Sequence, residues 1–238
     1  MAQLVCKYRK GEEARWLSHL DIKRTLERAM RRASLPLALT QGHNPHPKIS
    51  LGPPLGLGVT GEGELVAIHL ETAIDPDRLK EQLNAQLPPG LQVTEAWALP
   101  TYRKKETFGE IDVAEYRVTV EGGPPVGEIA ARVQALLARP EAVVQRGGER
   151  PERQVDVRPL ILSLTAREAP AGGSELHMRL RTGSHGGARP QEVVDLLGLG
   201  GEDCRVSYHR LGLYAGVPAE PPRSTGLIRR WGRTRRRE

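Results

Sequence analysis

Apolar positions in the first hundred residues follow two different periods. Runs at 2–9 and 64–71 have the composition of strands, whereas Ile22, Leu26, Ala29, Met30 and Ala33 recur at helical spacing. Residues 18–33 are therefore expected to form an amphipathic helix, with Ser18 as its N-cap. The same reasoning predicts strands at 37–40, 48–51 and 91–99, and a helix at 75–87 that begins at Asp75-Pro76 and ends before Pro88-Pro89-Gly90.

The second half repeats this order of elements. Strands are expected at 115–121, 142–146, 155–165 (one or two), 175–181 and 204–214, with helices at 126–138 and 190–197. Each half thus has a strand, a helix, two or three strands, a helix and a strand. This order predicts an α+β fold of tandem ferredoxin-like (split β-α-β) units with antiparallel sheets.

Four segments follow from this reading of the chain. They are a first unit at 1–100, a linker at 101–114, a second unit at 115–216 and a basic tail at 217–238. The tail has many arginines and no periodicity, so it is expected to be disordered. Because the ferredoxin-like fold hosts many functions, function has to be argued from the sites.

Composition narrows the class of protein. A net charge of +6 favours a nucleic acid or another polyanion as partner, although a basic, solvated surface would give the same balance. Two cysteines are too few for a disulfide framework or for a cysteine-ligated zinc or iron–sulfur site. No run approaches the length of a membrane span. We therefore expect a cytoplasmic protein without cofactor, metal or membrane partner.

The predicted helix at 18–33 carries a basic stripe. Arg24, Arg28 and Arg31 follow one another at i, i+4 and i+7, with Lys23 and Arg32 beside them. Guanidinium groups at one-turn spacing match phosphates along a nucleic-acid backbone. The alternative is a solvated face on which Glu27 pairs with Lys23 or Arg31.

The GHNPHPK loop (residues 42–48) is the densest group of polar recognition residues. Lys48 could contact a phosphate, Asn44 a base edge, and His43 or His46 could stack on a base. Either histidine could instead act as the general base in RNA cleavage, so both are weak catalytic candidates. Two histidines alone are weak evidence for a metal site, and a rigid structural turn also remains open.

A second candidate loop at 182–190 leads into the last predicted helix. Ser184, Arg189 and the backbone N–H groups at the helix start could bind an anion, and Arg210 on the final strand could face the same ligand. An ordinary connection between a strand and a helix is the alternative.

Several motifs resemble those of a known bacterial family. SHLD at 18–21, RAMRRASLP at 28–36 and QGHNPHPK at 41–48 resemble the signature of the radical SAM-linked family, a domain of unknown function. The segments VDVRP and GSHGGARPQEV extend the likeness to about residue 216, although His43 stands where the family commonly has Phe. Such domains are fused to, or encoded beside, radical SAM proteins, often near ribonuclease E/G and ribosomal-protein genes. The chain has no C-x-x-x-C-x-x-C motif, so the resemblance implies an accessory partner of a separately encoded radical SAM protein.

Three hypotheses follow. The first is an accessory protein, not an enzyme by itself, that binds structured RNA (transfer or ribosomal) and presents it to the radical SAM protein. The second is a metal-independent endoribonuclease, because the doubled architecture also resembles enzymes that cut CRISPR repeats; Lys48 would stabilise the cleaved phosphate. The third is a docking partner of the radical SAM protein that binds no nucleic acid.

Overall fold

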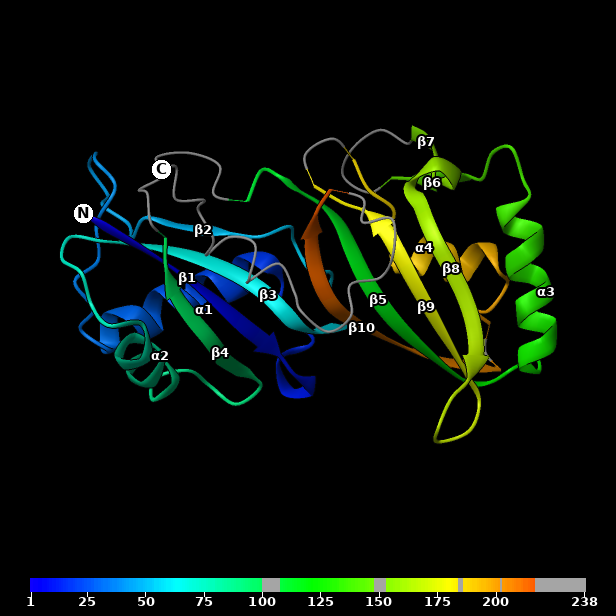
Figure 1. The fold of residues 1–238 in the computed structure, drawn as a ribbon, viewed down its shortest axis with the longest axis horizontal. Helices are drawn as coiled ribbons and strands as arrows, with labels where there is room; N and C mark the ends of the chain where they lie inside the picture. Colours follow the sequence, from blue (N-terminus) through cyan, green and yellow to red (C-terminus); the bar gives the residue numbers. More distant parts are fainter. Residues whose placement is uncertain (100–107, 148–152, 184–185, 202, 217–238) are drawn as a thin grey trace, which may run out of the picture. The chain divides into compact units, whose positions relative to one another are not determined.

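The computed structural model describes residues 1–99, 108–147, 153–183, 186–201 and 203–216. These residues form four α-helices and mostly antiparallel strands, an α+β arrangement (Figure 1). They divide into two compact units, Met1–Ile111 with Gly212–Glu238, and Asp112–Leu211. Residues 101–107 of the predicted linker and the predicted tail at 217–238 lie outside the described residues. None of the described helices has the length and apolar character needed to span a membrane.

Unit 1 contains most of the first half of the chain. Its elements in order are β1 (Ala2–Lys10), a 3-10 turn (Glu12–Ala14), α1 (His19–Arg32), β2 (Ile49–Leu51), β3 (Val59–Leu70), α2 (Pro76–Asn84) and β4 (Leu91–Ala98). The strands lie in the order β4-β1-β3, and β2 pairs antiparallel with β3.

Both helices of unit 1 pack on one face of this sheet. Leu26 and Met30 of α1 and Leu79 of α2 are fully buried in the same cluster as Cys6 of β1 and Ile68 of β3. These are the apolar positions that the helical and strand periods select. Helix α1 therefore has its apolar side in the core and its basic side at the surface.

The strand predicted at 37–40 is not formed as a continuous strand. Leu37 bridges Leu70, and Leu39 bridges Pro47, as isolated pairs. Pro36 precedes this segment and Pro47 is the bridge partner of Leu39, and both limit regular ladder formation because proline donates no backbone hydrogen bond. Strand β3 also starts five residues earlier than predicted. At Gly61 within it, a Cβ atom would lie 2.6 Å from Glu64 Oε1, so this glycine permits a close approach rather than a turn.

Unit 2 contains β5 (Ile111–Gly122), α3 (Val126–Leu137), β6 (Val143–Arg146), β7 (Arg153–Asp156), a 3-10 turn (Arg158–Leu160), β8 (Ile161–Glu168), β9 (Ser174–Arg181), α4 (Pro190–Leu196) and β10 (Cys204–Ala215). Ile111 and the last residues of β10 are assigned to unit 1. The order of its strands is β10-β5-β9-β8, and β6 and β7 form a separate hairpin. The predicted stretch at 155–165 is therefore the end of one strand and the start of another, separated by the 3-10 turn.

The centre of unit 2 lies along β9. Met178 pairs with Tyr116 of β5 and with Leu164 of β8, and all three side chains are buried. Helix α3 lies against β8 and buries Ile129 and Val133 (Figure 1). The loop before α4 thus follows β9, the strand that pairs with both β5 and β8.

Candidate nucleic-acid interface

Helix α1 has a well-defined start. The backbone N–H of Asp21 donates to Ser18 Oγ (3.2 Å), and the Asp21 carboxylate accepts from the Ser18 backbone N–H (3.1 Å) and hydroxyl (2.6 Å). These hydrogen bonds from Ser18, with a smaller contribution from the charge of Arg24, hold the pKa of Asp21 below its ordinary 3.8. The capping box therefore fixes where the helix begins and sets the register of its surface residues.

The basic stripe faces the GHNPHPK loop. Arg24, Arg28 and Arg31 are exposed, and together with Asn44 and His46 they line an open hollow of about 470 Å³; Glu27 and Pro45 complete the lining. Within the part of the chain that the structure describes, none of these three guanidinium groups forms an ion pair. They extend over about 10 Å of the helix axis.

The loop is held in place by its own backbone. Thr40 and His46 close it, since Thr40 N–H donates to His46 O (2.8 Å) and His46 N–H donates to Thr40 Oγ1 (3.0 Å). Gly42 has a φ of +128°, a backbone conformation that favours glycine. Pro45 and Pro47 restrict the backbone of the residues before them, Asn44 and His46. The two recognition side chains therefore sit on a stiff loop.

Lys48 lies behind the loop rather than in the hollow. Its backbone pairs with Ala38 and with His69 of β3 (Lys48 N–H to Ala38 O, 2.8 Å; His69 N–H to Lys48 O, 3.0 Å), and its side chain is half-buried. His69 is buried, and burial together with the charge of Lys48 lowers its pKa. Lys48 therefore has a neighbour that the sequence did not indicate, because His69 is 21 residues away on a strand.

The other predicted residues of unit 1 lie outside the lining of the hollow. Arg32 donates to Gln86 O (2.5 Å) and Gln86 Oε1 (3.3 Å), so its guanidinium fixes the C-terminal end of α2. Lys23 is 3.9 Å from Glu27. His43 is exposed. Glu27 was predicted only as an ion-pair partner, and the structure shows that it also contributes a negative charge to the hollow.

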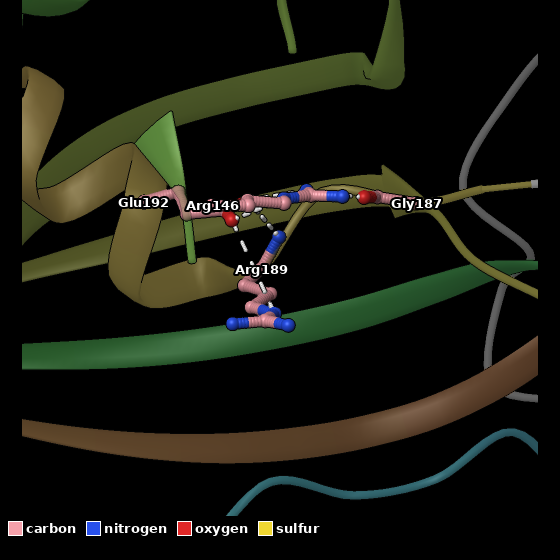
Figure 2. A network of polar contacts seen from close by, with 4 residues as sticks. All are labelled: Arg146, Gly187, Arg189 and Glu192. Carbon is pink, nitrogen blue, oxygen red and sulfur yellow. Dashed lines mark hydrogen bonds and ion pairs between the residues drawn. The ribbon is translucent and has the colours of Figure 1, made fainter. Parts of the chain in front are cut away.

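The loop before α4 is occupied by charges of the protein itself. Figure 2 shows Arg146 bound through two nitrogens to the Glu192 carboxylate (both 2.7 Å) and donating to Gly187 O (2.6 Å). The backbone N–H of Arg189 donates to Glu192 Oε2 (2.9 Å), while the Arg189 side chain is 70% exposed. The Glu192 carboxylate therefore accepts the hydrogen bond from the Arg189 N–H, one of the backbone groups that the sequence predicted to bind an external anion.

Ser184 and Arg210 are the remaining contacts predicted in this half of the chain. Ser184 lies outside the described residues. Arg210 is fully buried (0% exposed), so its guanidinium has no surface to offer to a nucleic acid. The burial of Arg210 could not be predicted, because strand alternation indicates two faces but not which face the fold covers.

A cluster on β9 also pairs its charges internally. Glu175 accepts from Arg167 (2.7 Å) and His177 (2.7 Å), and Arg117 lies 3.8 Å away. Burial alone would raise the pKa of Glu175, but the hydrogen bonds from His177 and Arg167 hold it below the ordinary value. Among the described residues, no group of three His, Cys, Asp or Glu side chains is arranged to hold a metal ion.

Comparisons with solved structures give distant matches. A Cbf5-Nop10-Gar1 complex matches 87% of this chain and 47% of its own chain at 12% identity, with a TM-score of 0.44. The archaeal box H/ACA sRNP Nop10-Cbf5 complex matches 87% and 46% at 13% identity and a TM-score of 0.39. An unknown protein from Galdieria sulphuraria matches 88% and 98% at 18% identity and a TM-score of 0.25. The chain spans about half the length of the first two.

A search of curated proteins finds no match. A family model does match, and it covers residues 3–190. That range includes all of the motifs at 18–48, the hollow that they line and the start of α4. The chain belongs to the bacterial family described as "Uncharacterized protein conserved in bacteria (DUF2344)".

Proposed function

We propose that this protein binds structured RNA, transfer or ribosomal, through the α1 arginines and the GHNPHPK loop. One observation carries the proposal: Arg24, Arg28 and Arg31 share a hollow with Asn44 and His46, and no described carboxylate forms an ion pair with them. Exposed arginines in this arrangement are available for bidentate contacts with phosphates. Asn44 and His46 add an amide and an imidazole that can contact bases, which are most accessible in the loops of a folded RNA.

The order of elements supports assigning each unit to the ferredoxin-like fold. Unit 1 runs β1-α1-β2-β3-α2-β4 and has β4-β1-β3 with β2 next to β3. Unit 2 has the same order, β5-α3-β8-β9-α4-β10, apart from the inserted β6-β7 hairpin, and its sheet order β10-β5-β9-β8 corresponds strand for strand. We assign one ferredoxin-like fold to residues 1–100 and another to 115–216, joined at 101–114, although β5 already begins at Ile111 within that connection. The arginine-rich segment at 217–238 would add further charge for RNA.

We further propose that the protein is an accessory of a separately encoded radical SAM protein, in the cytoplasm. The motif resemblance supports this association. An iron–sulfur cluster needs three or four thiolates, and this chain has Cys6 and Cys204. Burial raises the pKa of Cys6 to about 12, so its thiol stays protonated. The cluster and its chemistry would belong to the partner, while this chain would hold the RNA.

The test uses the purified full-length protein and total cellular RNA at two salt concentrations. Wild type is compared with Arg28→Glu/Arg31→Glu and with a double variant of equal charge change, Arg78→Glu/Arg139→Glu, which alters exposed arginines that are not part of the lining of the hollow. We expect wild type and the control to bind a discrete RNA at low salt, and the α1 double variant to lose that binding. Affinity should fall steeply as salt rises. Absence of wild-type binding at low salt would overturn the proposal and favour a protein-docking role.

The integrity of the RNA decides the second candidate function. His46 lines the same hollow as the three arginines, so a general base beside a bound phosphate is geometrically possible. Discrete cleavage products that disappear with His46→Ala would identify an endoribonuclease. Intact RNA with binding retained supports the accessory role.

A further inference from the structure

Three large apolar side chains of unit 1 are exposed near the start of α1. Trp16 is 65% exposed, Leu20 51% and Leu57 59%. Leu57 precedes Gly58, where a Cβ atom would lie 3.1 Å from the Trp16 ring. Leu20 lies on the first turn of α1, four residues after Trp16. We call Trp16, Leu20 and Leu57 the apolar platform, because exposed apolar side chains that gather in one region can mark a binding site.

The platform is rigidly supported. The Gly58 N–H donates to Arg15 O (2.9 Å), and the Arg15 guanidinium lies 4.7 Å from the centre of the Trp16 ring. Beneath it, Lys10 is 99% buried, and its ammonium group donates to Leu17 O (2.9 Å) and Gly56 O (3.3 Å). A buried lysine thus links the segment that carries Trp16 to the loop that carries Leu57. The indole is held in place before any ligand arrives.

The platform is continuous with the basic stripe. Leu20 precedes Arg24 by four residues, so it lies on the same face of α1 as Arg24, Arg28 and Arg31. Leu20 and Arg31 are separated by about 16 Å along the helix axis. An RNA strand whose phosphates follow the arginines would therefore reach the indole at its end.

We propose that an unpaired base of the bound RNA stacks on Trp16, with Leu20 and Leu57 as its apolar surroundings. This inference rests on the proposed function, since the arginines bring the strand to the platform. Size favours a base over a protein: a standard protein interface takes about 20–30 residues on each side, whereas a base needs one exposed aromatic ring. The Arg15 guanidinium lies over one face of the ring, so the base would stack on the opposite face.

The test measures dissociation constants for a fluorescein-labelled 12-nucleotide oligo(A) RNA and its abasic counterpart, by anisotropy at several salt concentrations. The variants are Trp16→Ala, Trp16→Phe and Arg28→Gln, each checked by circular dichroism and thermal unfolding. Trp16→Ala should weaken oligo(A) binding about tenfold or more, while Trp16→Phe retains most of it. Because stacking releases no counterions, Trp16→Ala should leave the salt slope unchanged, whereas Arg28→Gln should lower it by about one.

Two results would overturn the inference while leaving the proposed function intact. One is an unchanged oligo(A) affinity in folded Trp16→Ala with Arg28→Gln still impaired, which would favour a protein as occupant of the platform. The other is an equal effect of Trp16→Ala on the abasic strand, which would show that no base is involved. Failure of wild type to bind oligo(A) at low salt would also overturn the inference, whereas the proposed function is decided separately by binding of total cellular RNA.

Discussion

Arginines lie on helix α1 and around the loop before α4, but they differ in whether a carboxylate of the protein pairs with them. Arg24, Arg28 and Arg31 line an open hollow and form no ion pair among the described residues, although Glu27 also contributes to the lining. Arg146, at 12% exposure, is bound through two nitrogens to Glu192, which also accepts from the Arg189 backbone. The first group is available to a ligand, whereas the second stabilises the protein's own loop.

This difference shows what makes a basic residue a binding residue. An arginine already paired with a carboxylate must break that pair before it can bind a phosphate. An arginine that the fold leaves without such a partner needs only to be desolvated. The arginines of α1 are therefore the residues on which the proposed function depends. The ion pair between Arg146 of β6 and Glu192 of α4 contributes to stability instead.

The largest expected effect is on stability, at the ion pair of Arg146 and Glu192, which is largely shielded from solvent. Arg146→Ala leaves the Glu192 carboxylate, also 12% exposed, without its main partner, so unfolding free energy should fall by about 3 kcal/mol or more. Urea denaturation measures this loss. The double variant Arg146→Ala/Glu192→Ala should recover part of it, because the unpaired charge is then absent. If Arg146→Ala lowered the unfolding free energy no more than an ordinary surface substitution does, the loop before α4 would not differ from α1 as proposed.

A smaller effect is expected on RNA affinity from single arginines. Arg28→Gln should lower the salt slope of RNA binding by about one, because one phosphate contact is removed. Arg189→Gln should leave the slope unchanged, and the exposed Arg78→Gln serves as the matched control on α2. Equal slopes for Arg28→Gln and Arg189→Gln would remove the distinction between the two regions.

The start of α1 offers a test of how the stripe is positioned. Ser18→Ala removes the N-cap, which should lower stability by about 1 kcal/mol. It should also raise the pKa of Asp21 toward 3.8, since the hydrogen bonds from Ser18 are the main cause of its depression. Because the pKa of Asp21 is lower in the folded than in the unfolded protein, Asp21 stabilises the fold at pH values above its unfolded pKa. This contribution is lost as the pH falls through its pKa in the folded protein. NMR titration of Asp21 in both proteins checks the shift; an unchanged pKa in Ser18→Ala would contradict it.

The smallest effect concerns the support of the GHNPHPK loop. The lowered pKa of His69 means that the unfolded chain binds the proton first, so stability should decline as pH falls below 6.5 toward the folded value. His69→Gln should flatten this decline in urea unfolding between pH 7 and pH 5. His43→Gln, which changes an exposed histidine of the loop, should not. A decline that persists in His69→Gln would assign the acid sensitivity to another group.

Local chemistry made much of α1 predictable. Ser18 as cap and the buried face of Ile22, Leu26, Ala29 and Met30 follow from short-range rules, and the structure confirms both. Arg32 and Lys48 were not predictable in the same way. Gln86 and His69, the residues they act on, lie far away in sequence.

The helical stripe of Arg24, Arg28 and Arg31 and the stiffness of the loop with Pro45 and Pro47 follow from the amino-acid sequence alone, because helical register and proline geometry are local properties. Folding was needed to bring this stripe and Asn44 to one hollow, to pair Glu192 with Arg146 and to bury Arg210. A charge acquires its role from its neighbours. Those neighbours are brought together by packing of segments distant in the chain, which no local pattern records.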